Sequence, residues 1–138
     1  GINGETSSDL LRRSWGVLKS HPGAKIGLLM IGTNDTKTPI PIKVYRDNLR
    51  QIINSIIVNG KTPIVATLPE LEFSPYYMKN RDHIFKYNTA IREMSKDLNF
   101  LVCEMKGLNN YLIDGVHFTH EGNKEIANRW AKTIMSLS

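Results

Sequence analysis

An acid and a histidine lie three residues apart near the C-terminus, in the segment Asp114-Gly115-Val116-His117. Residues three apart on a strand point to opposite faces, so this spacing, with a glycine inside it, favours a tight turn. In such a turn the carboxylate can accept a hydrogen bond from one imidazole nitrogen while the other nitrogen stays free to take a proton. The pair therefore has the chemistry of a general base with its orienting acid, as nucleophilic catalysis requires.

Two further residues occupy loop positions beside predicted elements. Asn34 lies in the loop at the carboxyl end of an apolar run. Gly4 precedes a predicted helix. Each has an ordinary explanation, since asparagine is common in turns and glycine in loops.

Four amphipathic helices and three short strands are predicted around these segments. Apolar residues at helical spacing predict helices over about 7–20, 42–58, 81–98 and 122–137. Short apolar runs predict buried strands over 24–31, 62–68 and 100–104. Strands that alternate with helices form a parallel sheet covered on both faces. The predicted fold class is α/β, a three-layer α/β/α sandwich.

The helical patterns also predict which side chains face the core. The first helix has Thr6 or Ser7 as its expected N-cap. Trp15 falls on the apolar face of that helix, together with its leucines. Tyr45 and Tyr87 fall on the apolar stripes of the second and third helices, so both are expected in the core.

The predicted site residues gather at one edge of this sheet. In open parallel sheets, sites lie at the carboxyl ends of the strands. Asn34 follows the first strand, the Asp114–His117 turn comes after the third, and Gly4 can lie at the same edge because it opens a helix. The segment 69–78 follows the second strand and is predicted to be a loop. Its aromatic residues either line a substrate pocket or cover the core edge; they are Phe73, Tyr76 and Tyr77.

Composition narrows the classes of partner and cofactor. The 138 residues include 41% hydrophobic and 22% charged residues, as in one ordinary globular domain spanning 1–138. The net charge of +5 is spread along the chain, and no apolar run has the length of a membrane helix. We therefore expect neither a nucleic-acid nor a membrane partner. No glycine-rich nucleotide pattern occurs, so no cofactor is expected. The compartment is not predicted, because the sequence opens at Gly1 without methionine.

Three segments together resemble a known family. Gly1–Thr6, Ile31–Asp35 and Asp114–His117 are similar, in order and spacing, to the second, third and fifth sequence blocks of the SGNH, or GDSL-type, hydrolases. The resemblance implies a flavodoxin-like parallel sheet and a serine esterase or acylhydrolase that acts on a small carboxylic ester. It implies that Asp114 orients His117 as general base, and that the Gly4 N–H and the Asn34 side chain form the oxyanion hole. It implies no metal.

The family's first block is a departure. In the family, a Gly-Asp-Ser segment after the first strand supplies the nucleophile, and these 138 residues contain no Gly-Asp-Ser. We expect the nucleophilic serine and the N-terminal strands to lie outside this sequence, and the chain alone to have little activity. In the family's strand order, 2-1-3-4-5, the first strand is central. Strand 24–31 then becomes an unpaired apolar edge, which we expect to pair with an N-terminal fragment or a neighbouring chain.

Two other classes of function remain open. A fold of this kind without its serine can act as a non-catalytic ligand-binding module. Alternatively, Asp114, His117 and His120 can form the ligand set of a metal-dependent hydrolase, although His120 and Glu121 also suit the first turn of the last helix.

Overall fold

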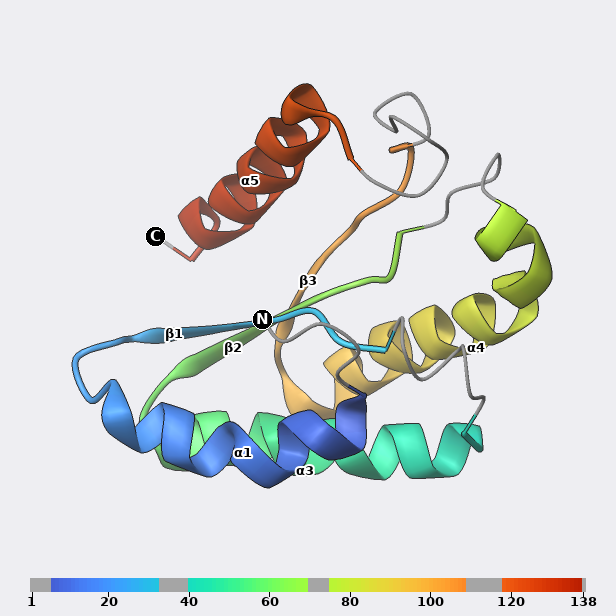
Figure 1. Ribbon diagram of the computed structural model, residues 1–138. Coiled ribbons are helices and arrows are strands. Elements are labelled where there is room, and N and C mark those ends of the chain that lie inside the picture. The colour runs from blue at the N-terminus through green and yellow to red at the C-terminus, as the bar shows by residue number, and fades with distance from the viewer. Residues whose placement is uncertain (1–5, 33–39, 70–74, 109–117, 138) are drawn as a thin grey trace.

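A three-stranded parallel sheet lies between helices on both of its faces (Figure 1). The computed structural model describes residues 6–32, 40–69, 75–108 and 118–137, and within 75–80 it describes the backbone alone. The sheet order is β1-β2-β3. The elements are α1 (Ser7–Ser20), β1 (Ile26–Leu29), α3 (Ile42–Val58), β2 (Thr62–Ala66), α4 (Pro75–Leu98), β3 (Leu101–Cys103) and α5 (His120–Met135).

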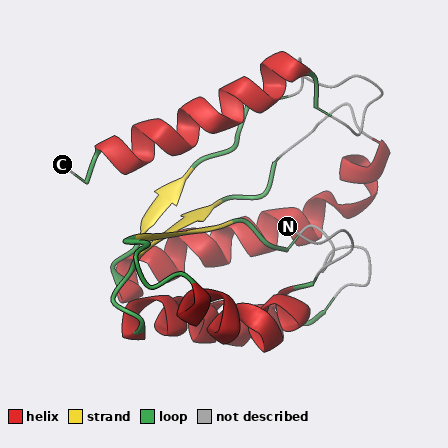
Figure 2. Cartoon of the chain, turned by 60° about the vertical axis from the view of Figure 1, so that its left-hand side comes forward, coloured by secondary structure: helices red, strands yellow, loops and turns green. Residues whose placement is uncertain are grey.

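The helices form two layers that sandwich the sheet, and this confirms the predicted α/β class. Helices α1, α3 and α4 lie on one side and α5 lies on the other (Figures 1 and 2). One apolar cluster lies between the sheet and helices α3 and α4, with Leu49, Ile53 and Ile91 fully buried. A second, smaller cluster on the α5 side contains Ile64 and Met105. Because parallel strands are buried on both faces, both clusters are needed to hold the sheet.

Helix α1 begins where the sequence predicts, because Thr6 caps it. The Thr6 hydroxyl accepts a hydrogen bond from the Asp9 N–H, and the Asp9 carboxylate accepts one from the Thr6 N–H at 3.1 Å. The prediction that Trp15 faces the core is wrong. Trp15 is 45% exposed, with Lys19 over its ring, and the small side chain of Ser14 is buried instead. Helix α1 packs against α3, and its Leu10, Leu11 and Leu18 pack against the core cluster.

Several predicted boundaries need correction. All three strands are shorter than predicted, with β2 ending at Ala66 and β3 covering only Leu101–Cys103. Strand pairing covers only 26–29 of the predicted strand 24–31. Helix α4 begins at Pro75, well before residue 81, so the predicted loop 69–78 is too long. A proline suits the first helical position because its missing N–H has no intrahelical acceptor there. Helix α5 starts at His120, two residues early, because Thr119 accepts a hydrogen bond from the Gly122 N–H.

Strand β1 forms one edge of the sheet, as the sequence predicts. Its partner on the inner side is β2, with Leu29 opposite Val65.

None of the helices in the described ranges is long and apolar enough to cross a bilayer.

Candidate active site

The carboxyl ends of the three strands meet at one edge of the sheet (Figure 1). Gly32 lies just beyond β1 and Leu68 just beyond β2, and the two residues are close together. A side-chain Cβ at Gly32 would lie 3.2 Å from Leu68 Cδ1. The end of β2 bonds β3 through the Thr67 N–H and the Cys103 carbonyl oxygen, 3.0 Å apart. The segments that follow these ends are 33–39, 70–74 and 109–117.

Most residues predicted for the site belong to these segments or to the N-terminus. Gly4, Asn34, Phe73, Asp114 and His117 lie outside the described residues. Tyr76 and Tyr77 belong to the first turns of α4 rather than to a loop, and their side chains lie outside the description. The structure does describe the residues that flank each of these segments.

Two tyrosines hold the flanks of segment 33–39. The Tyr45 hydroxyl donates to the Ile31 carbonyl oxygen at 2.7 Å, two residues before the segment. The Tyr87 hydroxyl donates to the Ile40 carbonyl oxygen at 3.0 Å, directly after it. The described residues on the two sides of the segment that contains Asn34 are therefore hydrogen-bonded to α3 and α4.

A buried asparagine holds the exit of β2. Asn88 of α4 is fully buried and accepts a hydrogen bond from the Leu68 N–H at 2.7 Å. Its side-chain amide donates to the Leu68 carbonyl oxygen at 3.0 Å. The two bonds satisfy both backbone groups of the residue at which β2 leaves the core.

A polar network joins the exits of β2 and β3. The Thr67 hydroxyl accepts a hydrogen bond from the Met105 N–H at 2.8 Å and donates to Glu104 at 3.3 Å. Arg92 donates to both carboxylate oxygens of Glu104, each at 2.9 Å. These hydrogen bonds hold the pKa of Glu104 below its ordinary value of 4.5, against the opposing effect of partial burial. The bidentate pair fixes α4 to the end of β3.

The segment that contains Asp114 and His117 lies between two core residues. Leu108 on one side is fully buried in the α5-side cluster, and Phe118 on the other side packs against the same cluster. Phe118 is followed by the α5 cap, Thr119. Arg129 of α5 donates to the carbonyl oxygens of Glu104 and Lys106, which ties the helix to the exit of β3.

The start of α1 is also fixed. The Asn48 side-chain amide donates to the hydroxyls of Ser7 and Ser8, each at 3.0 Å, and Ser7 is fully buried. Gly4 lies just before this anchored turn.

The serines in the described ranges lie in helices or at their ends, and most donate to a carbonyl of the preceding turn. Ser20 lies 3.1 Å from His21 Nδ1. The Ser20 hydroxyl donates to the Val17 carbonyl oxygen at 2.9 Å. Both residues lie at the C-terminal end of α1, before β1 begins and therefore away from the carboxyl ends of the strands.

The metal alternative depends on one described residue. His120 is exposed on the first turn of α5, while Asp114 and His117 lie outside the described ranges. Within those ranges, no three His, Cys, Asp or Glu side chains lie close enough to hold one metal ion.

The helical patterns place Tyr45 and Tyr87 on apolar helix faces and predict no role for their hydroxyls or for Asn88. The signal that could have found them is a hydrogen-bonding group on a buried helix face. Such a group must have a partner, and at a strand exit that partner is the backbone.

Comparison with solved structures shows the same fold in longer proteins. A GDSL-like lipase from Bacteroides thetaiotaomicron is 21% identical, with a TM-score of 0.85, and the match covers 100% of this chain and 75% of that one. A psychrotrophic esterase from Pseudoalteromonas is 19% identical, with a TM-score of 0.75 and coverage of 99% and 74%. An acetyl-xylooligosaccharide esterase from Geobacillus is 22% identical, with a TM-score of 0.80 and coverage of 97% and 69%. A comparison with curated proteins gives no match.

The family assignment comes from the sequence match. The model of the GDSL-like lipase/acylhydrolase family matches residues 1–125, nearly the whole chain. The match spans all the segments that contain predicted site residues. The chain therefore belongs to the GDSL-like lipase/acylhydrolase family of ester hydrolases.

Proposed function

We propose that this chain supplies the acid–base pair and the oxyanion hole of a serine ester hydrolase, and that the nucleophilic serine lies on a segment outside these 138 residues. His117 is the general base and Asp114 orients it. The Gly4 N–H and the Asn34 side chain donate to the oxyanion. No metal or organic cofactor takes part.

One observation supports this proposal above the others. Each segment that contains one of these residues is flanked by anchored residues: Thr6 and Ser7, Ile31 and Ile40, or Leu108 and Phe118. Anchored flanks restrict where a short segment can go, and a catalytic group must be held within about 0.5 Å of its productive position. A plain surface turn has no need of such support.

The proposed reaction has two steps. The serine oxygen attacks the ester carbonyl carbon while His117 takes the serine proton, and the oxyanion forms between Gly4 and Asn34. His117 then gives the proton to the leaving alcohol, which leaves an acyl-enzyme. Water attacks that ester while His117 takes its proton, and His117 returns the proton to the serine oxygen as the carboxylic acid is released.

The substrate proposed is a small ester. One structural neighbour is an acetyl-xylooligosaccharide esterase and another is a carbohydrate esterase from Talaromyces cellulolyticus, so acetylated sugars are natural first substrates to assay. Phe73, Tyr76 and Tyr77 are proposed to line the acyl or sugar pocket.

A fluorophosphonate probe tests the proposed nucleophile. In protein isolated from its source, we expect the probe to label one serine, and peptide mapping should place that serine outside these 138 residues. The same preparation should hydrolyse p-nitrophenyl acetate until the probe has reacted. Labelling of a serine within the chain would contradict the proposal, and activity that a chelator removes would favour the metal alternative.

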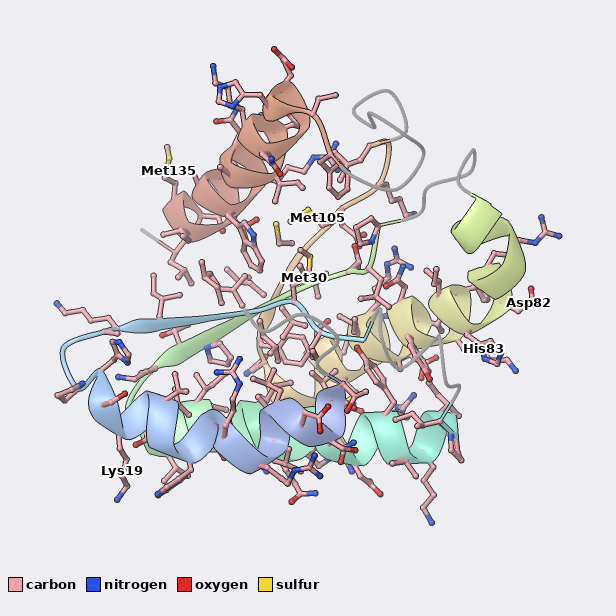
Figure 3. The ribbon with its side chains drawn as sticks, in the orientation of Figure 1. Lys19, Met30, Asp82, His83, Met105 and Met135 are labelled. Carbon is pink, nitrogen blue, oxygen red and sulfur yellow. The ribbon has the colours of Figure 1, made fainter. Side chains whose placement is uncertain are left out.

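The outer edge of β1, which pairs with no other strand in the described ranges, is where we propose that the serine segment docks. On the α1 side, a groove of about 260 Å³ runs beside β1, lined by apolar residues that include Leu10, Val17 and Ile56. On the α5 side, Leu28 is 47% exposed and Met30 is 41% exposed, and Figure 3 shows the Met30 side chain on that side of the sheet. A strand added beside β1 would meet apolar surface on both of its faces, as an inner parallel strand does.

A lysine at residue 28 tests this pairing. In the protein that includes the serine segment, we expect Leu28→Lys to lower the free energy of unfolding by about 2–3 kcal/mol. A strand paired with β1 would bury the lysine side chain. Val58→Lys is the matched control: Val58 is 71% exposed on α3 and should tolerate the change to within about 0.5 kcal/mol. Urea unfolding measures both. Equal, small effects would show that nothing covers β1.

A further inference from the structure

We propose that Tyr45 and Tyr87 are positioning residues that form one clamp on the segment carrying Asn34 and so set the place of its amide in the oxyanion hole. This inference rests on the proposed function. Neither tyrosine touches the reacting atoms in it; both act through Asn34.

The two tyrosines form a single rigid unit. Tyr45 comes from the first turn of α3 and Tyr87 from the middle of α4, and both are almost completely buried. Their rings stack with centroids 4.2 Å apart and planes 9° apart. Buried stacked rings have little freedom to rotate, so their hydroxyls keep a fixed separation.

Each hydroxyl holds one end of segment 33–39. Tyr45 donates to Ile31, three residues before Asn34, and Tyr87 donates to Ile40, six residues after it. Ile31 and Ile40 also pack against the same core cluster as the two rings. A segment with both ends fixed on one unit has fewer conformations than one held at a single end.

Gly32 brings the start of the segment close against the clamp. Its φ of +133° is one that residues with a side chain rarely adopt. A Cβ there would lie 2.9 Å from both the ring and the hydroxyl oxygen of Tyr45. The absence of a side chain at Gly32 therefore lets the chain turn out of β1 directly over Tyr45, two residues before Asn34.

This geometry suits a donor that has to be in place before the reaction. An oxyanion-hole donor contributes to catalysis only when it is preorganised at the position that the oxyanion will occupy. A displacement of about 1 Å can lower a rate by about 100-fold. The clamp holds the described residues on both sides of the Asn34 segment, Ile31 and Ile40.

Phenylalanine at each position tests the clamp, because it keeps the stacked ring and removes the hydroxyl. In the full-length protein we expect Tyr45→Phe to lower kcat for p-nitrophenyl acetate by about 10-fold, with KM changed by less than about 2-fold. Tyr87→Phe should act in the same direction. A kcat within about 2-fold of the unsubstituted protein in both variants overturns the proposal.

Lys61→Met is the control for lost stability. Lys61 is 6% exposed and donates to the carbonyl oxygens of His21 and Ala24 at 2.7 and 2.8 Å, at the opposite edge of the sheet. We expect this variant to lower the urea midpoint and to leave kcat per folded molecule unchanged. If Lys61→Met lowers kcat as Tyr45→Phe does, the effect is general loosening and the clamp is wrong.

The double variant Asn34→Ala/Tyr45→Phe tests two claims separately: that Asn34 stabilises the oxyanion, and that Tyr45 acts through Asn34. Asn34→Ala alone should lower kcat by about 100- to 1,000-fold. In the Asn34→Ala protein, Tyr45→Phe should not lower kcat further, because the amide that Tyr45 positions is absent. If Tyr45→Phe has its full effect there too, Tyr45 does not act through Asn34. If Asn34→Ala leaves kcat unchanged, the oxyanion assignment of the proposed function fails instead.

Discussion

Replacing His117 with alanine is expected to lower kcat of the full-length enzyme by roughly 10⁴- to 10⁶-fold, with p-nitrophenyl acetate as substrate. The serine hydroxyl is a weak nucleophile until a base takes its proton, and His117 is the base in both steps of the proposed reaction. Removing one member of such a unit costs about as much as removing all of it. Fluorophosphonate labelling should fall in parallel, since the probe reacts with the same activated serine.

His120→Ala is the matched control for this prediction. His120 lies three residues later, is exposed, and occupies the first turn of α5. In the serine mechanism its loss should change kcat by less than about 2-fold. A loss at His120 comparable to that at His117, together with inhibition by a chelator, would contradict the serine mechanism and support a metal site.

Local sequence signals predicted most of the scaffold. Helices α1 and α3 have the predicted boundaries, because Thr6 supplies a capping box and the apolar stripe of α3 is uninterrupted from Ile42 to Ile56. The strands are shorter than their apolar runs. Ile31 and Leu68 are apolar because they pack at the core edge, beyond the last paired residues.

Features that depend on tertiary contacts differ from the sequence prediction. The segment 69–78 is predicted to be a loop, but its Pro75 opens a helix. Trp15 fits the periodicity of α1, yet it is exposed while its neighbour Ser14 is buried. Periodicity ranks residues by hydrophobicity, whereas packing between two helices also depends on size.

The candidate site shows the same division. The types and spacing of Asp114 and His117, with Asn34 and Gly4, let the sequence predict a hydrolytic site, and these residues lie outside the described ranges. The hydrogen bonds that hold the flanking residues could not be predicted, because bonds such as Tyr87 to Ile40 join positions that are far apart in the chain. Such support becomes visible only when the fold brings α4 under the carboxyl ends of the strands.

Replacing Asn88 with alanine is expected to lower the free energy of unfolding by about 2–5 kcal/mol. The change leaves the N–H and the carbonyl oxygen of Leu68 without the partners they have now, in a region where Leu68 is 1% exposed. Each unsatisfied buried backbone group costs about 1–3 kcal/mol. This is a large share of the 5–15 kcal/mol that stabilises a typical domain, and urea unfolding should show it as a lower midpoint with an unchanged slope.

Asn59→Ala is the control for the loss of an asparagine amide. Asn59 donates to the Ser55 carbonyl oxygen at 2.7 Å at the more open C-terminal end of α3, where water can replace it, so the cost should be below about 1 kcal/mol. Asn88→Asp adds a test of the geometry. Burial favours the neutral acid, which can both donate and accept as the amide does, whereas the carboxylate cannot donate to the Leu68 carbonyl. The deficit of Asn88→Asp relative to the unsubstituted protein should therefore shrink as the pH falls from 7 toward 4. A deficit that is independent of pH would mean that Asn88 does not hold Leu68 by both bonds.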